Sequence, residues 1–427
     1  MFGSILFNGN IVKETDFIYK FRERILQSNH IDPTVRERKK ALLITGAWGK
    51  EEFQEAHVKQ ALKDIGIPSH FKNGFDENIQ NLSVYHEWMQ FQEKYPEVQE
   101  MYFGSLNNLF KIKTFYHERN AELVNLLQHH VRMVKKDYPH LSLSDFFSYN
   151  AQQEEWRVPL MNDRDLLMHY SCLEMQKTMS FLVGGDELQA KISAEIQDYA
   201  KIRSGLPANQ DYHIKRKELI DRILSSNSIF IFGGDVASLY YSLKFWELEW
   251  ALGEALVRGT NFYTVSAGSI VLCNKIIVYV ELPDKNGNKN HHFVFFDNGI
   301  GLVRKIKLFP HCRDRIQTHD PDNLAYLANR FQGRVCVGLN EESFLLMNAE
   351  RGPNGRIYPK YTSVGEKDGV YVFDLSGKKI CVNYGEQLMV PGTLLWEKNL
   401  QITRKTENVK TLLSQYSGST LWRDNEE

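Results

Sequence analysis

The stretch "NFYTVSAGSIVLC", residues 261–273, joins a run of β-branched and aromatic residues to a group of small ones. Residues 262–265 are typical of a strand. Ser266, Ala267 and Gly268 then permit a sharp turn from a strand into a helix, which can hold a serine hydroxyl out of the backbone. The stretch therefore predicts a strand and a tight turn, in which Ser266 is either a nucleophile or simply the first polar residue after the strand.

The same alternation of strand and helix occurs in two separate parts of the chain. Residues 228–273 contain an apolar strand, a glycine turn, a long helix and the strand before Ser266, and residues 39–68 contain one strand and its helix. From about residue 71 to 221, apolar residues recur every three or four positions, which predicts an almost wholly helical block. We expect an α/β fold, namely a three-layer α/β/α, doubly wound, mostly parallel sheet with a large all-helical insertion.

These changes of pattern suggest a division of the chain into five segments. We expect an N-terminal segment at 1–30, the first part of the α/β domain at 31–70, the helical insertion at 71–225, the second part of the α/β domain with the functional site at 226–400, and a C-terminal tail at 401–427.

Composition limits the classes of partner. The chain has 427 residues with 52 Lys and Arg against 53 Asp and Glu, a balance that favours neither nucleic acid nor anionic lipid as a partner. Its five cysteines form no CxxC pair, which argues against a zinc site and a disulfide framework. Neither a signal peptide nor a run of about 18 apolar residues is evident. We expect a cytoplasmic protein that needs no metal or organic cofactor.

Two further motifs supply groups that a serine nucleophile requires. The paired glycines Gly233 and Gly234 end a strand directly before a helix, so the N–H of Gly234 can join that of Ala267 in an oxyanion hole at the carboxyl edge of a parallel sheet. His311 follows another strand-like run, and a loop at the same edge could bring it within reach of Ser266 as a general base.

Four motifs in order resemble those of the cyanophycinase and aspartyl dipeptidase (dipeptidase E) family of serine peptidases. They are "FGGDVASL" at 232–239, "TVSAGS" at 264–269, "GIGLVRKIKLFPHCRDR" at 299–315 and "VGLNEESFLLM" at 337–347. The resemblance covers residues 228 to about 374 and the strand and helix at 41–68. It implies a fold similar to that of class I glutamine amidotransferases, with serine in place of their cysteine.

The resemblance also implies roles for individual residues. Ser266 would attack an amide carbonyl, His311 would transfer the proton, and Glu341 would orient the imidazole. Glu341 matches the glutamate of the cyanophycinase pattern. In the dipeptidase pattern the acid lies between serine and histidine, which keeps three other candidates open: Glu281, Asp284 and Asp297.

Three positions depart from the family pattern. Thr264 stands where the turn usually has glycine, Asp235 replaces a glutamine that contacts substrate, and Gln317 stands where a second arginine is frequent. Arg315 is retained and is the expected ligand of a substrate carboxylate.

Two hypotheses about function follow. The first is a serine hydrolase that cleaves an amide or peptide bond of a small peptide or isopeptide through an acyl-enzyme, with Asp235 and Arg315 near the substrate. The second is a catalytically weak or inactive relative that acts as a binding or scaffold module. In either case the helical insertion could contact a protein partner or a second copy of the chain.

Overall fold

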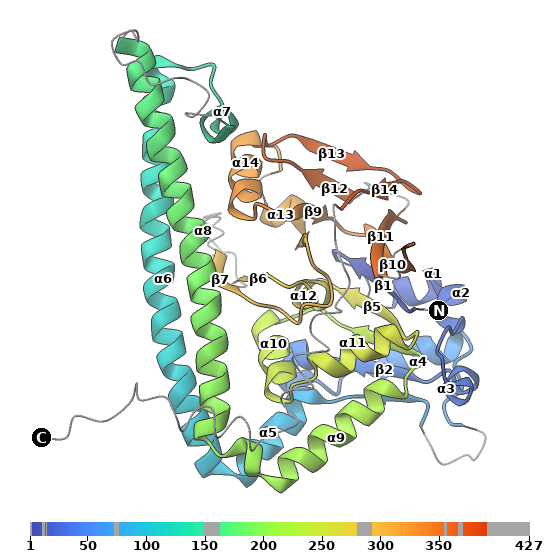
Figure 1. The fold of residues 1–427 in the computed structure, drawn as a ribbon. Helices are drawn as coiled ribbons and strands as arrows, with labels where there is room; N and C mark the ends of the chain where they lie inside the picture. The colour runs from blue at the N-terminus through green and yellow to red at the C-terminus, as the bar shows by residue number, and fades with distance from the viewer. Residues whose placement is uncertain are drawn as a thin grey trace, which may run out of the picture.

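A mixed sheet of eight strands forms the centre of the computed structural model (Figure 1). The structure describes residues 2–10, 13, 15–71, 77–148, 163–279, 293–316, 318–353, 357–365 and 370–390. Five neighbouring strands run parallel, in the order β1 (Ser4–Asn8), β5 (Asn261–Val265), β4 (Ser228–Ile231), β2 (Ala41–Ile44) and β3 (Ile79–Asn81). On the other side of β1, the antiparallel strands β10 (Phe344–Arg351), β11 (Ile357–Ser363) and β14 (Gln387–Leu388) complete the sheet.

Helices cover both faces of this sheet. Alternate strand residues point to opposite sides, so Leu42 and Ile44 join one core cluster while Ala41 and Leu43 join another. One cluster packs against α1 (Asp16–Lys20), α2 (Arg22–Leu26) and α4 (Ala56–Asp64). The other packs against α5 (Val84–Lys94), α9 (Gln210–Leu224), α10 (Val236–Phe245) and α11 (Glu249–Val257). The predicted three-layer α/β/α arrangement is confirmed.

A second sheet carries the strands after residue 300. Strands β8 (Ile306–Pro310) and β9 (Val335–Leu339) are parallel neighbours, and β12 (Val370–Phe373) and β13 (Lys379–Val382) extend this sheet in antiparallel fashion. Strands β6 (Ile276–Tyr279) and β7 (Phe293–Asp297) pair with each other. We expected the strand before His311 in the central sheet. It lies in the second sheet, where it pairs with β9, while the neighbours of β1 in the central sheet are β5 and β10.

The shorter helices fill the connections. A 3₁₀ helix, η1 (Gly46–Glu51), follows β2, and α3 (Pro33–Arg38) precedes that strand. Helices α12 (Ala267–Val271), α13 (Cys312–Arg315) and α14 (Pro321–Arg330) follow β5, β8 and α13 in turn.

Two segments lie elsewhere than expected. Strand β1 comes from the segment 1–30 that we placed before the α/β domain, yet it lies in the middle of the central sheet. Strand β3 comes from the expected helical block, and it pairs with β2 at the edge of the sheet. Both strands are short, with 5 and 3 residues, so their patterns are too brief to identify them.

Two long antiparallel helices form the main part of the insertion. Helix α6 (Pro96–Asp137) has 42 residues and α8 (Asp163–Arg203) has 41, and they pack along each other at one side of the α/β body (Figure 1). The short helices α7 (Leu143–Ser148) and η3 (Leu206–Ala208) lie near their ends. The predicted helical insertion is confirmed for this hairpin. Within the described ranges, no helix has both the length and the apolar character that crossing a membrane requires.

Buried charged groups attach the hairpin to the α/β body. Lys113 of α6 forms an ion pair with Asp297 at the end of β7, and both side chains are only 1% exposed. Ser193 of α8 donates a hydrogen bond to the same carboxylate over 3.0 Å. Burial alone would lower the pKa of Lys113, but Asp297 and the hydroxyl of Tyr241 outweigh it and raise that pKa. The ammonium group therefore stays charged inside the protein.

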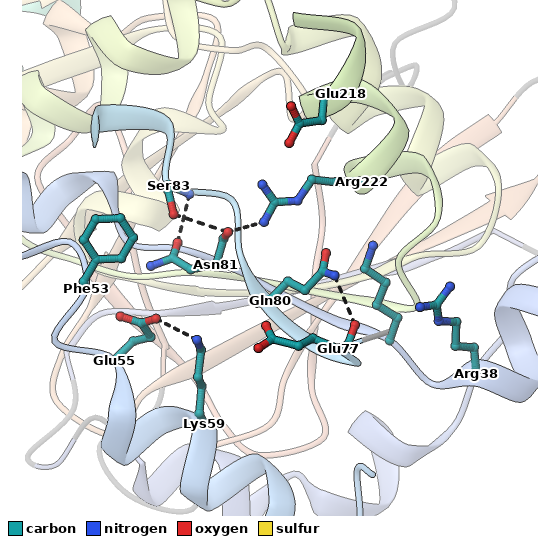
Figure 2. A pocket seen from close by; sticks show the side chains of 11 residues that line it. Arg38, Phe53, Glu55, Lys59, Glu77, Gln80, Asn81, Ser83, Glu218 and Arg222 are labelled. Carbon is teal, nitrogen blue, oxygen red and sulfur yellow. Dashed lines mark hydrogen bonds and ion pairs between the residues drawn. The ribbon is translucent and has the colours of Figure 1, made fainter. Parts of the chain in front are cut away.

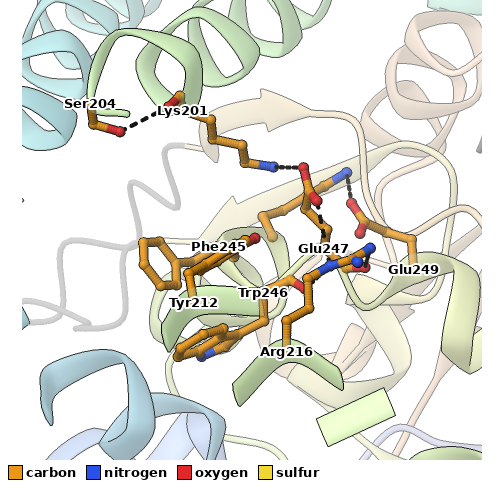
Figure 3. A network of polar contacts seen from close by, with 9 residues as sticks. Lys201, Ser204, Tyr212, Arg216, Phe245, Trp246, Glu247 and Glu249 are labelled. Atoms are coloured by element: carbon orange, nitrogen blue, oxygen red, sulfur yellow. Dashed lines mark hydrogen bonds and ion pairs between the residues drawn. The ribbon is translucent and has the colours of Figure 1, made fainter. Parts of the chain in front are cut away.

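A second attachment lies at the lower end of α8 (Figure 3). Lys201 binds Glu247 in the turn between α10 and α11, with 3.0 Å between Nζ and Oε1. Arg216 of α9 approaches the other oxygen of Glu247 at 3.4 Å. Beside them, Tyr212 and Trp246 stack with ring centroids 5.4 Å apart. Insertion and domain are thus joined by charge pairs flanked by an aromatic core.

Candidate active site

Ser266 occupies a strained turn between β5 and α12. Its backbone has φ 46° and ψ −108°, a conformation that non-glycine residues rarely adopt. Its N–H donates a hydrogen bond of 2.9 Å to the carbonyl of Asn8 at the end of β1, so the neighbouring strand holds the turn. The side chain projects at the end of two parallel strands, as expected of a serine at a strand-to-helix elbow.

Glycines make room for this turn. A Cβ at Gly233 would lie 2.9 Å from the Cβ of Ser266, and a Cβ at Gly268 would lie 2.2 Å from the carbonyl oxygen of Ile231. Both positions therefore require glycine. Position 264 has threonine where the family pattern usually has glycine, and the structure explains this difference. The buried hydroxyl of Thr264 lies 3.2 Å from the carbonyl oxygen of Leu6 and 2.8 Å from the hydroxyl of Ser269.

His311 lies within hydrogen-bond distance of Ser266. Its Nε2 is 2.9 Å from Ser266 Oγ, although the two residues come from different sheets. His311 follows β8 with φ 52° and precedes α13. The side-chain oxygen of Asn340 accepts hydrogen bonds of 2.9 Å from the backbone N–H of Arg313 and from the thiol of Cys312. Asn340 thereby fixes the turn that presents the imidazole.

The sequence analysis did not identify Asn340 as part of the site. Its position directly before Glu341, in the fourth of the family-like motifs, was the signal that could have drawn attention to it. The residue is 5% exposed, and a buried amide of this kind normally has a structural partner.

Glu341 lies at the same strand ends as His311. The register pairs Pro310 with Leu339, so the residues after β8 and β9 leave the second sheet side by side. Glu341 is exposed, and its Oε1 accepts a hydrogen bond of 3.1 Å from the side chain of Asn10, just beyond β1. The role of Glu341 as the orienting acid stays a prediction.

The other candidate acids differ in their surroundings. Asp297 is buried, and its two oxygens accept hydrogen bonds from Lys113, from Ser193 and from the backbone N–H of Asn298. It serves the attachment of the hairpin. Glu281 and Asp284 lie outside the described residues, so the structure bears on neither.

The expected oxyanion donors flank the serine. Ala267 is the first residue of α12, where a backbone N–H has no acceptor within the helix. Gly234 has φ 136° and packs against the carbonyl of Ala47, from which a Cβ would be 2.6 Å away. In the described part of the chain, the N–H of Gly234 donates to no other group. Both N–H groups can therefore receive a ligand.

The structure describes the side chain of only one of the two residues expected to contact substrate, Asp235 and Arg315. Asp235 caps α10, since its carboxylate accepts hydrogen bonds from the N–H of Ala237 (2.8 Å) and the hydroxyl of Ser238 (3.0 Å). Arg315 ends α13, but its side chain lies outside what the structure describes. Its role as a carboxylate ligand stays a prediction.

One buried carboxyl group near this edge was not anticipated. Glu52, after η1, accepts hydrogen bonds from the backbone N–H groups of Tyr85 (3.2 Å) and His86 (2.6 Å) in the first turn of α5. Burial raises its pKa to about 7, although these two hydrogen bonds oppose the rise. Glu52 therefore acts as a cap of α5 whose charge changes near neutral pH.

A separate cavity of about 580 Å³ lies beside the edge strand β3 (Figure 2). Its polar side chains largely satisfy one another: Lys59 pairs with Glu55 at 2.9 Å, and Arg222 donates to the carbonyl of Asn81. The described residues that line it include neither Ser266 nor His311. Nothing in this cavity indicates a reaction.

A known family matches the part of the chain that contains Ser266. Residues 205–352 match the family model of Peptidase family S51. This part of the chain is a peptidase S51 domain. The S51 domain contains Ser266, His311 and Glu341, and it begins before α9 and ends after β10. No curated protein matches the chain.

Among solved structures, the chain is similar to a peptidase from an acI-B1 Actinobacterium. The two are 13% identical, the match covers 91% of this chain and 97% of that one, and the TM-score is 0.40. The likeness is too distant to carry an argument about substrate.

Proposed function

We propose that the protein is a serine hydrolase that cleaves an amide or peptide bond of a short peptide or isopeptide through an acyl-enzyme. The observation that carries this proposal is the distance of 2.9 Å between Ser266 Oγ and His311 Nε2, with Ser266 held at φ 46°. A serine is a weak nucleophile unless a base lies within hydrogen-bond reach, and here one does. The S51 domain supports the same class of reaction.

The chemical steps follow from this geometry. Ser266 Oγ attacks the carbonyl carbon while its proton passes to His311 Nε2. The N–H groups of Gly234 and Ala267 stabilise the negative oxygen that forms. The C–N bond then breaks, the imidazolium gives its proton to the departing amine, and a water molecule activated by the same imidazole releases the acyl group. Glu341 holds the imidazole in the required orientation.

Arg315 supports a preference for acidic substrates. It belongs to the short helix that begins directly after His311, so its backbone lies close to the base. A guanidinium group binds a carboxylate through two parallel hydrogen bonds. We expect Arg315→Ala to slow the cleavage of acidic dipeptides or isopeptides much more than that of their amidated analogues. An equal loss for both would remove the carboxylate contact from the proposal.

A fluorophosphonate probe tests the nucleophile directly. The full chain should be labelled at Ser266, as located by mass spectrometry of its peptides, and Ser266→Ala should not be labelled. Ser238→Ala is the matched control, because Ser238 lies at the same edge of the sheet and its hydroxyl binds only Asp235 among the described side chains. This variant should react like the wild type. Absence of labelling in folded wild-type protein would favour a binding module without turnover.

A further inference from the structure

Large apolar side chains lie exposed along the helical hairpin. Each is at least 42% exposed, which is unusual for side chains of this size in such number. Those that share one side of their helix are Met101, Phe115, Leu126 and Met133 on α6, and Tyr170, Phe181, Leu188 and Tyr199 on α8. Leu167 of α8 is also 47% exposed, but it lies about 60° around the helix from Tyr170 and is not counted with them.

On each helix these residues lie on one side. Consecutive members are separated by 7, 11 or 14 positions, and steps of that size return a helical side chain to within about 40° of its starting direction. The buried residues Lys113 of α6 and Ser193 of α8 lie on other sides of their helices and bind Asp297 of the α/β body. The apolar stripes therefore lie on other sides of α6 and α8 than the residues that bind the α/β body.

Contacts between α6 and α8 show which positions of the two helices lie side by side. Arg119 of α6 lies against Gly185 of α8, where a Cβ would be 1.7 Å from the guanidinium Nη2. One residue on, Asn120 donates a hydrogen bond of 3.0 Å to Asp186. Because the helices are antiparallel, residues with higher numbers on α6 lie beside residues with lower numbers on α8.

This register places Phe115, Leu126 and Met133 of α6 within about two positions of an exposed residue on α8, and Met101 about five positions from Tyr199. The four pairs, which we call the apolar ladder, are Met101 with Tyr199, Phe115 with Leu188, Leu126 with Phe181, and Met133 with Tyr170. Phe115 and Phe181 lie one helical turn before Arg119 and Gly185, so both stripes border the seam between the helices.

We propose that the apolar ladder is the interface of a homodimer, in which two hairpins pack face to face as an antiparallel four-helix arrangement. The composition of the ladder is the same from either end: a Met–Tyr pair, two Phe–Leu pairs and a Met–Tyr pair. A twofold axis between the second and third pairs brings Phe115 onto Leu126, Leu188 onto Phe181 and Tyr170 onto Tyr199 of the second copy, while Met101 and Met133 are offset by about 10 Å along the helix. A self-complementary patch of this kind is what a twofold symmetric contact requires.

The size of the ladder also fits a second copy. From residue 101 to 133 it is about 48 Å long at 1.5 Å per residue. Two helices with axes about 9 Å apart present a strip about 18 Å wide, or about 850 Å² per subunit. Stable protein–protein contacts bury about 800 Å² on each partner. The proposal is independent of the catalytic role of Ser266.

Sedimentation equilibrium of the full chain tests the dimer. The wild type should sediment at about twice its chain mass of 49.7 kDa. Phe115→Glu and Phe181→Glu should each raise the dissociation constant at least about 100-fold, since every substitution occurs twice at the centre of the interface. Ile214→Glu is the matched control, because Ile214 is 59% exposed on α9 outside the ladder. It should leave the dimer intact.

Crosslinking tests the antiparallel arrangement independently of the charge variants. In a Cys381→Ser background, which removes the exposed cysteine, Phe115→Cys combined with Leu126→Cys should give a crosslinked dimer with a short bismaleimide. On one helix these positions are about 16 Å apart, too far for a short reagent. Met101→Cys combined with Leu126→Cys should crosslink far less. A monomeric wild type, or dimerisation retained in both glutamate variants, would overturn the proposal.

Discussion

The surroundings of Ser266 and the attachment of the helical hairpin are built in different ways. Around Ser266 the chain is packed so closely that a Cβ at Gly233 would lie 2.9 Å from the Cβ of Ser266, and a Cβ at Gly268 would lie 2.2 Å from the carbonyl oxygen of Ile231. At the attachment, long charged side chains reach across, and Lys113 pairs with Asp297 in a site where both are 1% exposed. The first region fixes the position of one hydroxyl group, whereas the second fixes the position of a whole element.

This difference predicts which property each region controls. Under the proposed mechanism, a change at Ser266 or His311 removes a reacting group but leaves the packing nearly as it was. A change at Lys113 or Asp297 leaves a buried charge without its partner, which costs stability.

The largest effect is expected for Ser266→Ala. Loss of a triad nucleophile typically lowers kcat by about 10⁴-fold or more. The free energy of unfolding should change by less than about 1 kcal/mol, since the hydroxyl is removed from a turn that backbone contacts hold. Steady-state hydrolysis and urea unfolding would be measured on the same preparation. A variant as active as the wild type would assign the chemistry to another residue.

Glu341→Gln should lower the rate by about 10²- to 10⁴-fold, because an imidazole in the wrong orientation or tautomer cannot accept the proton of Ser266. Asp297→Asn is its counterpart at the attachment, and we expect it to retain the rate per folded molecule. The comparison requires activity normalised to the folded fraction. The reverse ranking would place the orienting acid between serine and histidine, as in the dipeptidase pattern.

Lys113→Ala should lower the free energy of unfolding by about 3–5 kcal/mol, because it leaves the carboxylate of Asp297 buried without a cation. The double variant Lys113→Met with Asp297→Leu should recover much of this loss, since it removes both charges. Thermal and urea unfolding would measure both. Equal destabilisation of single and double variants would show that the pair contributes packing and not charge compensation.

The smallest effect concerns Glu52. Its pKa is about 7 in the folded protein and 4.5 is the ordinary value, so the folded state holds a proton that the unfolded state has lost between these pH values. Stability should therefore fall as pH rises from about 4.5 to about 7, by about 2–3 kcal/mol in all. Glu52→Gln should flatten this part of the profile. Parallel profiles for wild type and variant would contradict the assignment.

Much of the fold follows from local pattern. The strands before Ser266 and His311, the glycine turn at 233–234 and the helical insertion all have sequences whose periodicity or turn residues identify them. The expectation that Ser266 and His311 lie together rested on the strands that both residues follow and on the resemblance of four ordered motifs to a serine peptidase family. The structure places them 2.9 Å apart, and their catalytic roles stay predictions.

The structural features that the sequence did not predict depend on contacts between residues that are far apart in the chain. Lys113 and Asp297 are 184 positions apart, and nothing near either one indicates its partner. The burial that raises the pKa of Glu52 arises only when α5 packs against η1. Asn340 acts through the backbone of Arg313, which a pattern of side chains does not reveal. The division into two sheets depends on pairings between strands that lie far apart in the chain, such as β1 with β10.

That division has a consequence for how the proposed activity could be lost. Ser266 is carried by the central sheet and His311 by the second one, and the sheets meet where a Cβ at Gly9 would lie 2.3 Å from the carbonyl oxygen of Leu339. A slip of about 1 Å at this junction would separate oxygen from nitrogen beyond hydrogen-bond range while every helix and strand stayed folded. The reactivity of Ser266 toward a fluorophosphonate probe should therefore depend on the alignment of the two sheets. On heating, this reactivity should decline before any secondary structure is lost.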